Sequence, residues 1–324
     1  MENIFQKIKR FNETINSEIE YKLNPFEKLY IFFDFVIERV FHKTMLLDYT
    51  QYKFYDKKNR ERRKYVVFGR LIEIMEICND NSYRHIFDDK IEFNKKFQNY
   101  IYRTWIDLRE IKFDEFNNFI DSNDEFFIKD PLGMFGTGIK KIQSNEIQDR
   151  KKLYNELKER NALCEEPISQ CNEMAKFNKS TVNTIRVVTM VDRNNTPYVI
   201  GGLLRLGRTG KFADNYHHNG IAAYINPELG IVSTMGVDKN KKKHVLHPDT
   251  SEKIVGFEVP NWEELVKVIK KAALEVPQMR YIGWDVAITS DYKVELIEGN
   301  SGADPDAEQI TTQEGRWNYY KKYF

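Results

Sequence analysis

The chain has 324 residues, enough for about two domains, and 41% of them are hydrophobic. Its 50 basic and 49 acidic side chains give a formal charge of +1, which is typical of a folded soluble protein and not of a nucleic-acid coat or an acidic tail. Three cysteines without a CxxC pair predict neither a disulfide framework nor a zinc site, and they favour a reducing, cytoplasmic setting.

The first 88 residues have mainly helical spacing. The N-terminus lacks the apolar core of a secretory signal, so we expect no export by that route. The most apolar early stretch, residues 29–40, is interrupted by Asp34 and Glu38 and is too short to cross a bilayer. Its apolar residues recur every three or four positions, which predicts a buried helix.

A basic run, KKNRERRKY, occupies residues 57–65. Such a run can contact an anionic surface, such as lipid headgroups or nucleic acid. Because the whole chain is nearly neutral, we favour a solvated helix face. Weak contact with a membrane surface is the alternative, and we expect no nucleic-acid partner.

The hydrophobic period changes near residue 124, where the apolar run EFFIK leads into the glycine-rich segment DPLGMFGTGIKKI. This pattern predicts a strand that ends in a turn. Further strands are expected at 183–191, 198–206, 281–289 and 293–298.

Between these strands, residues 261–276 have the spacing of a helix, with Asn261 and Glu264 placed as a capping box. We therefore predict one α+β domain over residues 89–324, preceded by a mostly helical region over residues 1–88.

The glycine-rich segment matches neither the Walker nor the dinucleotide-binding motif. Gly133, Gly136 and Gly138 nevertheless allow backbone N–H groups to approach phosphate oxygens, and Lys129 at the strand end supplies a positive charge. A phosphate-binding loop is one interpretation of this segment, and an ordinary turn is the other.

The last two predicted strands contain a stronger signal. If a two- or four-residue loop joins them, Asp285 lies opposite Glu298 with Cβ atoms ~5 Å apart, and Asn300 shares their face. Facing carboxylates repel unless a cation or a shared proton compensates, so these oxygens predict a site for Mg²⁺ or Mn²⁺. A surface hairpin and a proton-sharing acid pair are the alternatives, and a loop of odd length would break the register.

Over residues 88–302 the chain resembles the ATP-grasp superfamily, in particular its sugar-transfer-associated branch related to α-L-glutamate ligases. The likeness is carried by FDDKIEFNKKF, FFIKDPLGMFGTGIKKI, STVNTIRVVTM and GWDVAITSDYKVELIEGN. It implies an α+β ATP-grasp fold, in which two lobes hold ATP between them. The helical N-terminal region departs from the α/β domain usual at that place, so acceptor recognition does not carry over.

The resemblance implies a role for each matched position. Phosphate contacts would come from Lys90, Lys129 and the loop with Gly133, Gly136 and Gly138; an adenine hinge from Glu165, Glu166 and Ile168; and ligands to two magnesium ions from Asp285, Glu298 and Asn300. Gln170 and Glu173 are the alternatives for the ribose.

Arginines on two predicted strands could neutralise charge during the reaction. These are Arg186 and Arg205, for which a structural salt bridge is the alternative. A polar loop with Asp214, Asn215, His217 and His218 either reaches the acceptor or is simply solvated.

The resemblance implies an ADP-forming ligase that joins a small-molecule carboxylate to an amine through an acyl phosphate. Its substrates would be sugar-linked or free small molecules of surface-polysaccharide biosynthesis. A kinase with the same nucleotide site and a non-catalytic interaction module of a polysaccharide assembly are the alternatives.

Overall fold

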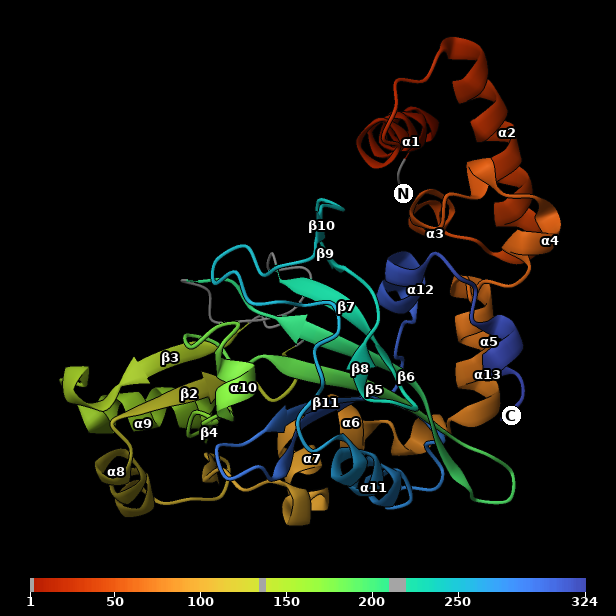
Figure 1. Ribbon diagram of the computed structural model, residues 1–324. Coiled ribbons are helices and arrows are strands. Elements are labelled where there is room, and N and C mark those ends of the chain that lie inside the picture. Colours follow the sequence, from red (N-terminus) through yellow and green to blue (C-terminus); the bar gives the residue numbers. More distant parts are fainter. Residues whose placement is uncertain (1–2, 134–137, 210–219) are drawn as a thin grey trace.

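The computed structural model describes residues 3–133, 138–209 and 220–324, which form two lobes and an N-terminal group of helices (Figure 1). Gly136 lies outside these residues, as does the predicted acceptor loop with Asp214, Asn215, His217 and His218. Their predicted roles remain predictions.

The N-terminal helices pack around their own apolar core. Asn3 and Asn24 start the first two helices, and each side chain accepts a hydrogen bond from the backbone three residues later, as N-caps do. Phe11, Ile15 and Tyr49 are among the buried residues of this core. The helices of this group are α1 (Ile4–Glu18), α2 (Pro25–His42), α3 (Leu46–Gln51) and α4 (Asn59–Arg62), with a 3₁₀ turn at Phe54–Asp56. The next helix, α5 (Phe68–Cys78), packs in a core of the large lobe instead.

Helix α2 forms where the sequence predicts it, but it is not a buried helix. Only Ile31 and Glu38 are buried, and most of its apolar side chains lie on the surface. The prediction of burial was wrong because helical spacing identifies an apolar face without showing that anything covers it.

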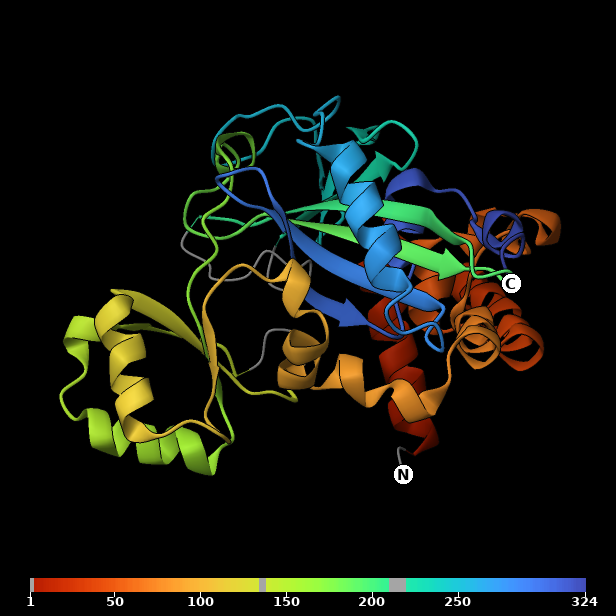
Figure 2. The ribbon, with the colours of Figure 1, turned by 90° about the horizontal axis from the view of Figure 1, so that it is seen from below.

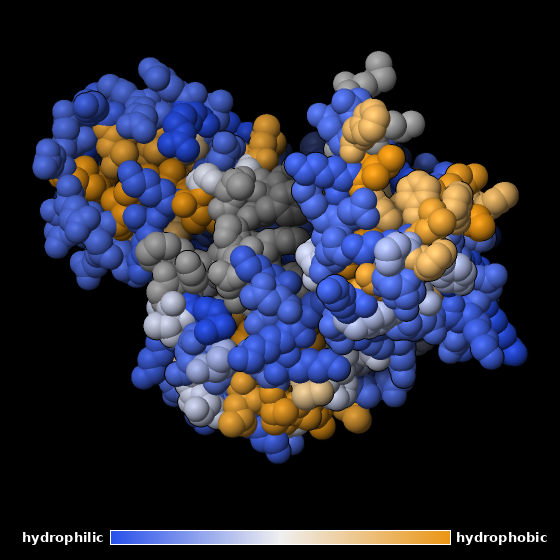
Figure 3. Space-filling model, turned by 90° about the horizontal axis from the view of Figure 1, so that it is seen from above, coloured by the Kyte–Doolittle hydropathy of each residue, from blue (hydrophilic) through white to orange (hydrophobic). Residues whose placement is uncertain are grey.

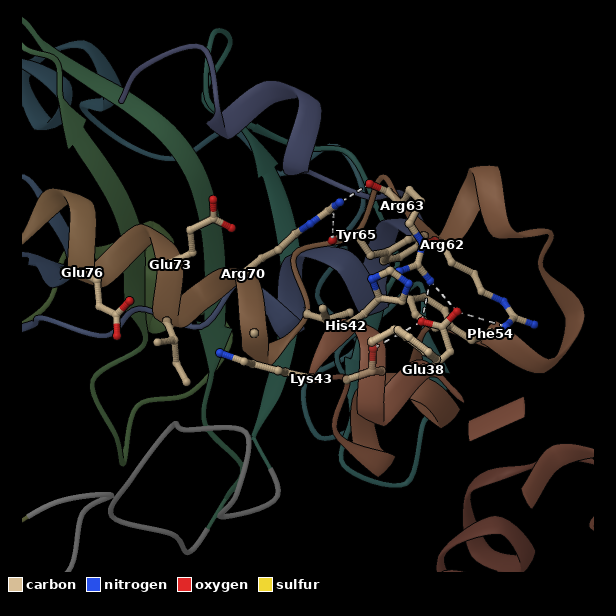
Figure 4. Close-up of a pocket in the computed structure, with 15 residues that line it drawn as sticks. Glu38, His42, Lys43, Phe54, Arg62, Arg63, Tyr65, Arg70, Glu73 and Glu76 are labelled. Carbon is tan, nitrogen blue, oxygen red and sulfur yellow. Dashed lines mark hydrogen bonds and ion pairs between the residues drawn. The ribbon is translucent and has the colours of Figure 1, made fainter. Parts of the chain in front are cut away.

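We expected the basic run 57–65 to be a solvated helix face, but several of its side chains make contacts inside the protein. Lys57 donates a hydrogen bond to the Tyr52 carbonyl at 2.6 Å. Arg62 is only 5% exposed and pairs with Glu38 at 3.3 Å, and Arg63 also pairs with Glu38. Glu38, Arg62 and Arg63 line a cavity of about 390 Å³ beside α2, α4 and α5 (Figure 4). Much of the charge in the run therefore holds the N-terminal helices together.

The small lobe is a four-stranded antiparallel sheet in the order β1-β4-β2-β3, with two helices on one face. Figure 2 shows it set apart from the rest of the molecule. Alternate residues of β2 face opposite ways: Phe126 and Ile128 pack under the helices, and Phe127 and Lys129 face the other side. The elements are β1 (Trp105–Asp107), α8 (Phe113–Ser122), β2 (Glu125–Lys129), β3 (Lys140–Gln143), α9 (Arg150–Glu159) and β4 (Leu163–Glu165).

The large lobe is built on an antiparallel sheet in the order β10-β9-β7-β6-β5-β11-β12, with β8 paired to β7. Its strands are β5 (Thr184–Val191), β6 (Pro197–Leu206), β7 (Ile221–Asn226), β8 (Ile231–Val232), β9 (Gly236–Asp238), β10 (Lys243–His244), β11 (Tyr281–Ile288) and β12 (Val294–Asn300). The four long strands predicted here are confirmed to within two residues at each end.

Helices cover both faces of this sheet. Leu265 and Ile269 of α11 belong to the core on one face, and Leu71 and Ile74 of α5 belong to the core on the other. The remaining helices are α6 (His85–Asp88), α7 (Lys90–Lys96), α10 (Asn172–Ala175), α11 (Trp262–Ala273), α12 (Asp306–Thr312) and α13 (Trp317–Tyr320). In the described part of the chain, no helix has both the length and the apolar character needed to span a membrane.

The predicted capping box of α11 was wrong. Asn261 precedes the helix in a left-handed conformation, and its side chain donates to the Tyr292 carbonyl at 2.8 Å instead of capping. The helix also ends at Ala273, before the predicted residue 276. A tertiary contact with the hairpin loop here replaces the local cap that the sequence suggests.

Alanine substitutions at two glycines of the large lobe should differ in their effect on stability, because only one of the two is closely packed. Gly230 has a φ of +71°, and a Cβ added there would lie 2.3 Å from Cγ of Trp262, whereas Gly256 has a φ of +82° and nothing within 4 Å of that position. We expect Gly256→Ala to lose only the backbone strain, ~1 kcal/mol, and Gly230→Ala to lose about 3 kcal/mol or more. Thermal unfolding followed by circular dichroism measures both, and equal losses would contradict the packing explanation.

Candidate functional site

A cavity of about 510 Å³ lies between the two lobes, a size that suits a nucleotide-sized ligand. Its walls come from β2 and β4 of the small lobe, from the segment after β4, and from β11 and β12 of the large lobe. Nine of the predicted site residues line it: Lys90, Lys129, Gly133, Glu165, Glu166, Ile168, Arg205, Asp285 and Glu298. Gly138, Arg186 and Asn300 are not among its lining residues.

The predicted carboxylate pair is present, since Asp285 of β11 lies directly opposite Glu298 of β12. The loop between the strands, however, has five residues and not two or four, because the last pair before it is Ile288 with Val294. A β-bulge next to Asp285 shifts the register by one residue and restores the predicted pairing. The odd loop and the bulge cancel each other.

Both predicted arginines bind Asp285. Arg186 lies across from it on β5 and donates to both carboxylate oxygens, with Nη2 2.7 Å from Oδ2. Arg205 donates through Nη1 at 2.9 and 2.8 Å. Burial acts to raise the pKa of Asp285, but the two guanidinium groups outweigh it and hold that pKa well below its ordinary range.

The neighbouring Glu298 is affected in the opposite way. Burial, and then the adjacent Asp285, raise its pKa above the ordinary value. Asn300 completes the group by donating to Glu298 Oε1 at 3.4 Å. Two carboxylates this close repel when both are ionised, and either a bound cation or a shared proton relieves the repulsion.

The oxygen donors of this group fit magnesium. Within the described ranges, no cluster of three or more His, Cys, Asp or Glu side chains could hold a metal. A cation here would therefore bind through Asp285, Glu298, the Asn300 amide and groups of a bound ligand. That is the usual arrangement for Mg²⁺, which takes one or two carboxylates and completes its shell with phosphates and water.

Two lysines face the carboxylates across the cavity. Lys90 is the first residue of α7, which is held in place by Phe93 packing against Trp284 of β11. Its ammonium group donates to the Gly133 carbonyl, and burial lowers its pKa. Lys129, at the end of β2, forms an ion pair with Glu165.

A buried ion network under the cavity was missed by the sequence analysis. Arg103 is 5% exposed and joins the lobes: it pairs with Glu165 of β4 and Glu295 of β12, each at 3.0 Å, and donates to the Leu296 carbonyl at 2.8 Å. Burial acts to raise the pKa of Glu165, but Arg103 and Lys129 lower it to about 2. The apolar residues on both sides of Glu295 indicate a buried carboxylate. The sequence does not show which of the 50 basic residues pairs with it.

Comparison with known proteins identifies the architecture. A family model described as sugar-transfer associated ATP-grasp matches residues 55–322. The chain belongs to this ATP-grasp family. The resemblance and the fold class inferred from the sequence are therefore confirmed, and helices α1, α2 and α3 lie before the matched residues. Among curated proteins, no match was found.

Solved structures of ATP-grasp enzymes are similar at low identity. The ATP-grasp ligase PsnB with a minimal precursor has a TM-score of 0.46 and 13% identity, over 78% of this chain and 66% of that one. D-alanyl-alanine synthetase A from Vibrio cholerae gives 0.40 and 13%, over 66% and 55%. The ADP complex of purK, N5-carboxyaminoimidazole ribonucleotide synthetase, gives 0.42 and 9%, over 75% and 53%. The chain spans about half to two-thirds of these proteins.

In this ATP-grasp protein the segment after β4 is the predicted adenine hinge. The Glu165 carboxylate is already taken by Arg103 and Lys129. The Glu166 N–H donates to the Thr104 carbonyl at 2.9 Å, and the Ile168 N–H makes no hydrogen bond within the described residues. Of these backbone N–H groups, that of Ile168 would be available to adenine, and Glu166 also lines the cavity.

Neither residue suggested for the ribose has a free polar group at the cavity. The Gln170 amide donates to the Asn178 and Thr181 carbonyls and accepts from the Asn183 N–H at 3.0 Å. Glu173 does not line the cavity and accepts a hydrogen bond from the Tyr292 hydroxyl at 2.9 Å.

Proposed function

We propose that this ATP-grasp protein is an ATP-dependent, ADP-forming ligase that joins a carboxylate to an amine through an acyl phosphate. One observation carries the proposal: the cavity between the lobes brings together four lysines, among them Lys90 and Lys129, with Arg205 and a facing carboxylate pair. That is the combination of charges needed to hold a metal-bound triphosphate.

Each group has a part in this proposal. Lys90 and Lys129 contact the phosphates, and the Ile168 N–H meets adenine. Asp285, Glu298 and Asn300 hold magnesium, which would neutralise charge on the transferring phosphoryl group. Arg205, which lines the cavity, would neutralise charge on the phosphates, and Arg186 would hold Asp285 in position.

The reaction needs no nucleophilic side chain. An oxygen of the substrate carboxylate attacks the γ-phosphorus, an O–P bond forms, and the bond to the β–γ bridging oxygen breaks to release ADP. The amine nitrogen then attacks the acyl carbon, phosphate leaves, and the nitrogen loses a proton. The protein positions the reactants and neutralises charge, which accounts for most of the catalysis in phosphoryl transfer.

For the acceptor we propose a carboxylated sugar or a related small molecule of surface-polysaccharide biosynthesis, amidated or aminoacylated in the cytoplasm, where ATP is available. The description of the family, sugar-transfer associated, supports this choice. Magnesium is the proposed metal, in two ions, with manganese as the alternative.

The test uses a carboxylate labelled with ¹⁸O. The wild-type chain is incubated with Mg-ATP, a panel of labelled hexuronic acids and amino acids, and a mixture of amines. We expect ADP, phosphate carrying one ¹⁸O, and a product with the summed mass of both substrates less one water. A phosphoryl group that stays on the acceptor would mean a kinase, and release of AMP would mean a different chemistry. No dependence on Mg-ATP would favour an interaction module.

A further inference from the structure

The exposed side of helix α2 is an uninterrupted apolar stripe four turns long. It consists of Phe26, Leu29, Tyr30, Phe33, Val36, Ile37, Val40 and Phe41, which are between 38% and 84% exposed. No charged residue interrupts it, because the polar residues of α2 lie on the opposite side or at its edges. Figure 3 shows hydrophobic side chains gathered over the N-terminal helices, at the upper right.

The stripe is large enough for a stable interface. Phe26, Tyr30, Phe33 and Phe41 are 84%, 62%, 57% and 74% exposed, so their rings alone present roughly 500 Å² if each has about 200 Å² in all. The four aliphatic residues extend this area toward the ~800 Å² that each partner contributes to a specific interface. Surfaces of that size on a folded protein mark an interaction site.

We propose that the α2 stripe binds a second copy of this chain, with the two α2 helices packed antiparallel about a twofold axis. Helix α2 has Glu27 in its first turn and Arg39 and His42 in its last. An antiparallel pair brings Glu27 of each copy beside Arg39 of the other, and it also opposes the helix dipoles favourably. The apolar stripe meets the same stripe, as a twofold contact requires.

A membrane surface fits this stripe less well. A helix lying on anionic lipid has basic residues along its polar side. In α2 that side faces its own protein, where Asp34 and Glu38 pair with Arg62, at 2.9 and 3.3 Å. Several cations of the adjacent basic run are thereby used inside the fold and are not available to lipid headgroups.

The antiparallel arrangement specifies which residues meet. The stripe runs from residue 26 to residue 41, so its midpoint lies next to Phe33, and each Phe26 lies near the partner's Phe41. The chain's own cysteines are all buried, so cysteines introduced into the stripe report on this contact alone. Phe33→Cys is expected to crosslink with itself, whereas Phe26→Cys crosslinks efficiently only when mixed with Phe41→Cys.

Sedimentation velocity of the full chain over a range of concentrations tests the proposal. We expect the wild type to sediment as a dimer and the Phe33→Glu/Ile37→Glu variant as a monomer. Both positions are exposed, so the variant is expected to keep its circular dichroism spectrum. Leu229→Glu is the matched control: this leucine is 64% exposed outside the stripe, and its variant should remain dimeric.

A wild type that is monomeric at every concentration would overturn the proposal. So would a dimer that survives the double substitution, or self-crosslinking of Phe26→Cys as strong as that of Phe33→Cys, which would mean parallel helices. Co-sedimentation with phosphatidylglycerol vesicles is measured on the same proteins. A monomeric wild type that binds vesicles and a double variant that does not would assign the stripe to a membrane instead.

Discussion

Mg-ATP is expected to raise the melting temperature of the wild-type protein, and Asp285→Asn or Glu298→Gln is expected to abolish that rise. A ligand that binds only the native state at a hundred times its Kd adds about 2.7 kcal/mol to the free energy of unfolding. Either substitution removes one of the two carboxylates proposed to hold the metal. The measurement is thermal unfolding with and without Mg-ATP.

The baseline stability of each variant has to be measured separately, because Asp285→Asn leaves Arg186 and Arg205 without their buried anion. The comparison is therefore the shift caused by Mg-ATP in each protein. Asp291→Asn is the matched control, since Asp291 lies in the same hairpin, is exposed, and its partners are Lys293 and the Thr289 hydroxyl, away from the cavity. If the Asp285 and Glu298 variants show the same Mg-ATP-induced rise in melting temperature as the wild type, the proposed metal site is wrong.

Arg103→Met is expected to cost about 3 to 5 kcal/mol of stability, the usual loss when one partner of a buried ion network is removed. The substitution removes the cation that pairs with both Glu165 of the small lobe and Glu295 of the large lobe. Urea unfolding gives the loss directly. Arg150→Met removes an exposed pair with Asp121 and should cost 1 kcal/mol at most.

The pH dependence of this loss follows from Glu165. Its pKa is lowered to about 2 in the folded protein, so its contribution is complete above the unfolded pKa of ~4.3 and disappears as the pH falls toward 2. In Arg103→Met, protonation at low pH compensates the buried Glu165 carboxylate for its missing partner. The difference between wild type and variant should therefore shrink as the pH falls from ~4.3 toward 2. A difference that grows over this range would contradict the ion-network explanation.

Patterns in the sequence predicted those parts of the site that lie within a single strand or a single hairpin. The strand ending at Lys129 and the pairing of Asp285 with Glu298 follow from alternation along strands and from one hairpin. The pairing survived a wrong loop length only because the bulge compensates. Arg186 was a candidate on its own strand, but its place across from Asp285 depends on which strands are neighbours, and spacing does not show that.

The features that were missed depend on contacts between distant segments. Arg103 matters because the chain between the lobes passes beside Glu295, 192 residues away. Asn261 has the sequence of a cap, but it is held by the hairpin loop. Helix α2 has the periodicity of a core helix, and only the fold shows that its apolar side is left uncovered. Helix propensity and hydrophobic periodicity describe one segment at a time, whereas these three features depend on which distant segments pack against it.

The two arginines on Asp285 also bear on the order in which ligands arrive. While both guanidinium groups bind it, this carboxylate is neutralised, and a bare cation would have to compete with two positive charges at close range. In the proposed function, the phosphate oxygens of a bound nucleotide would give Arg205, which lines the cavity, another partner and so weaken its hold on Asp285. We therefore expect the site to bind magnesium together with its nucleotide and not the free ion, which is abundant in cells.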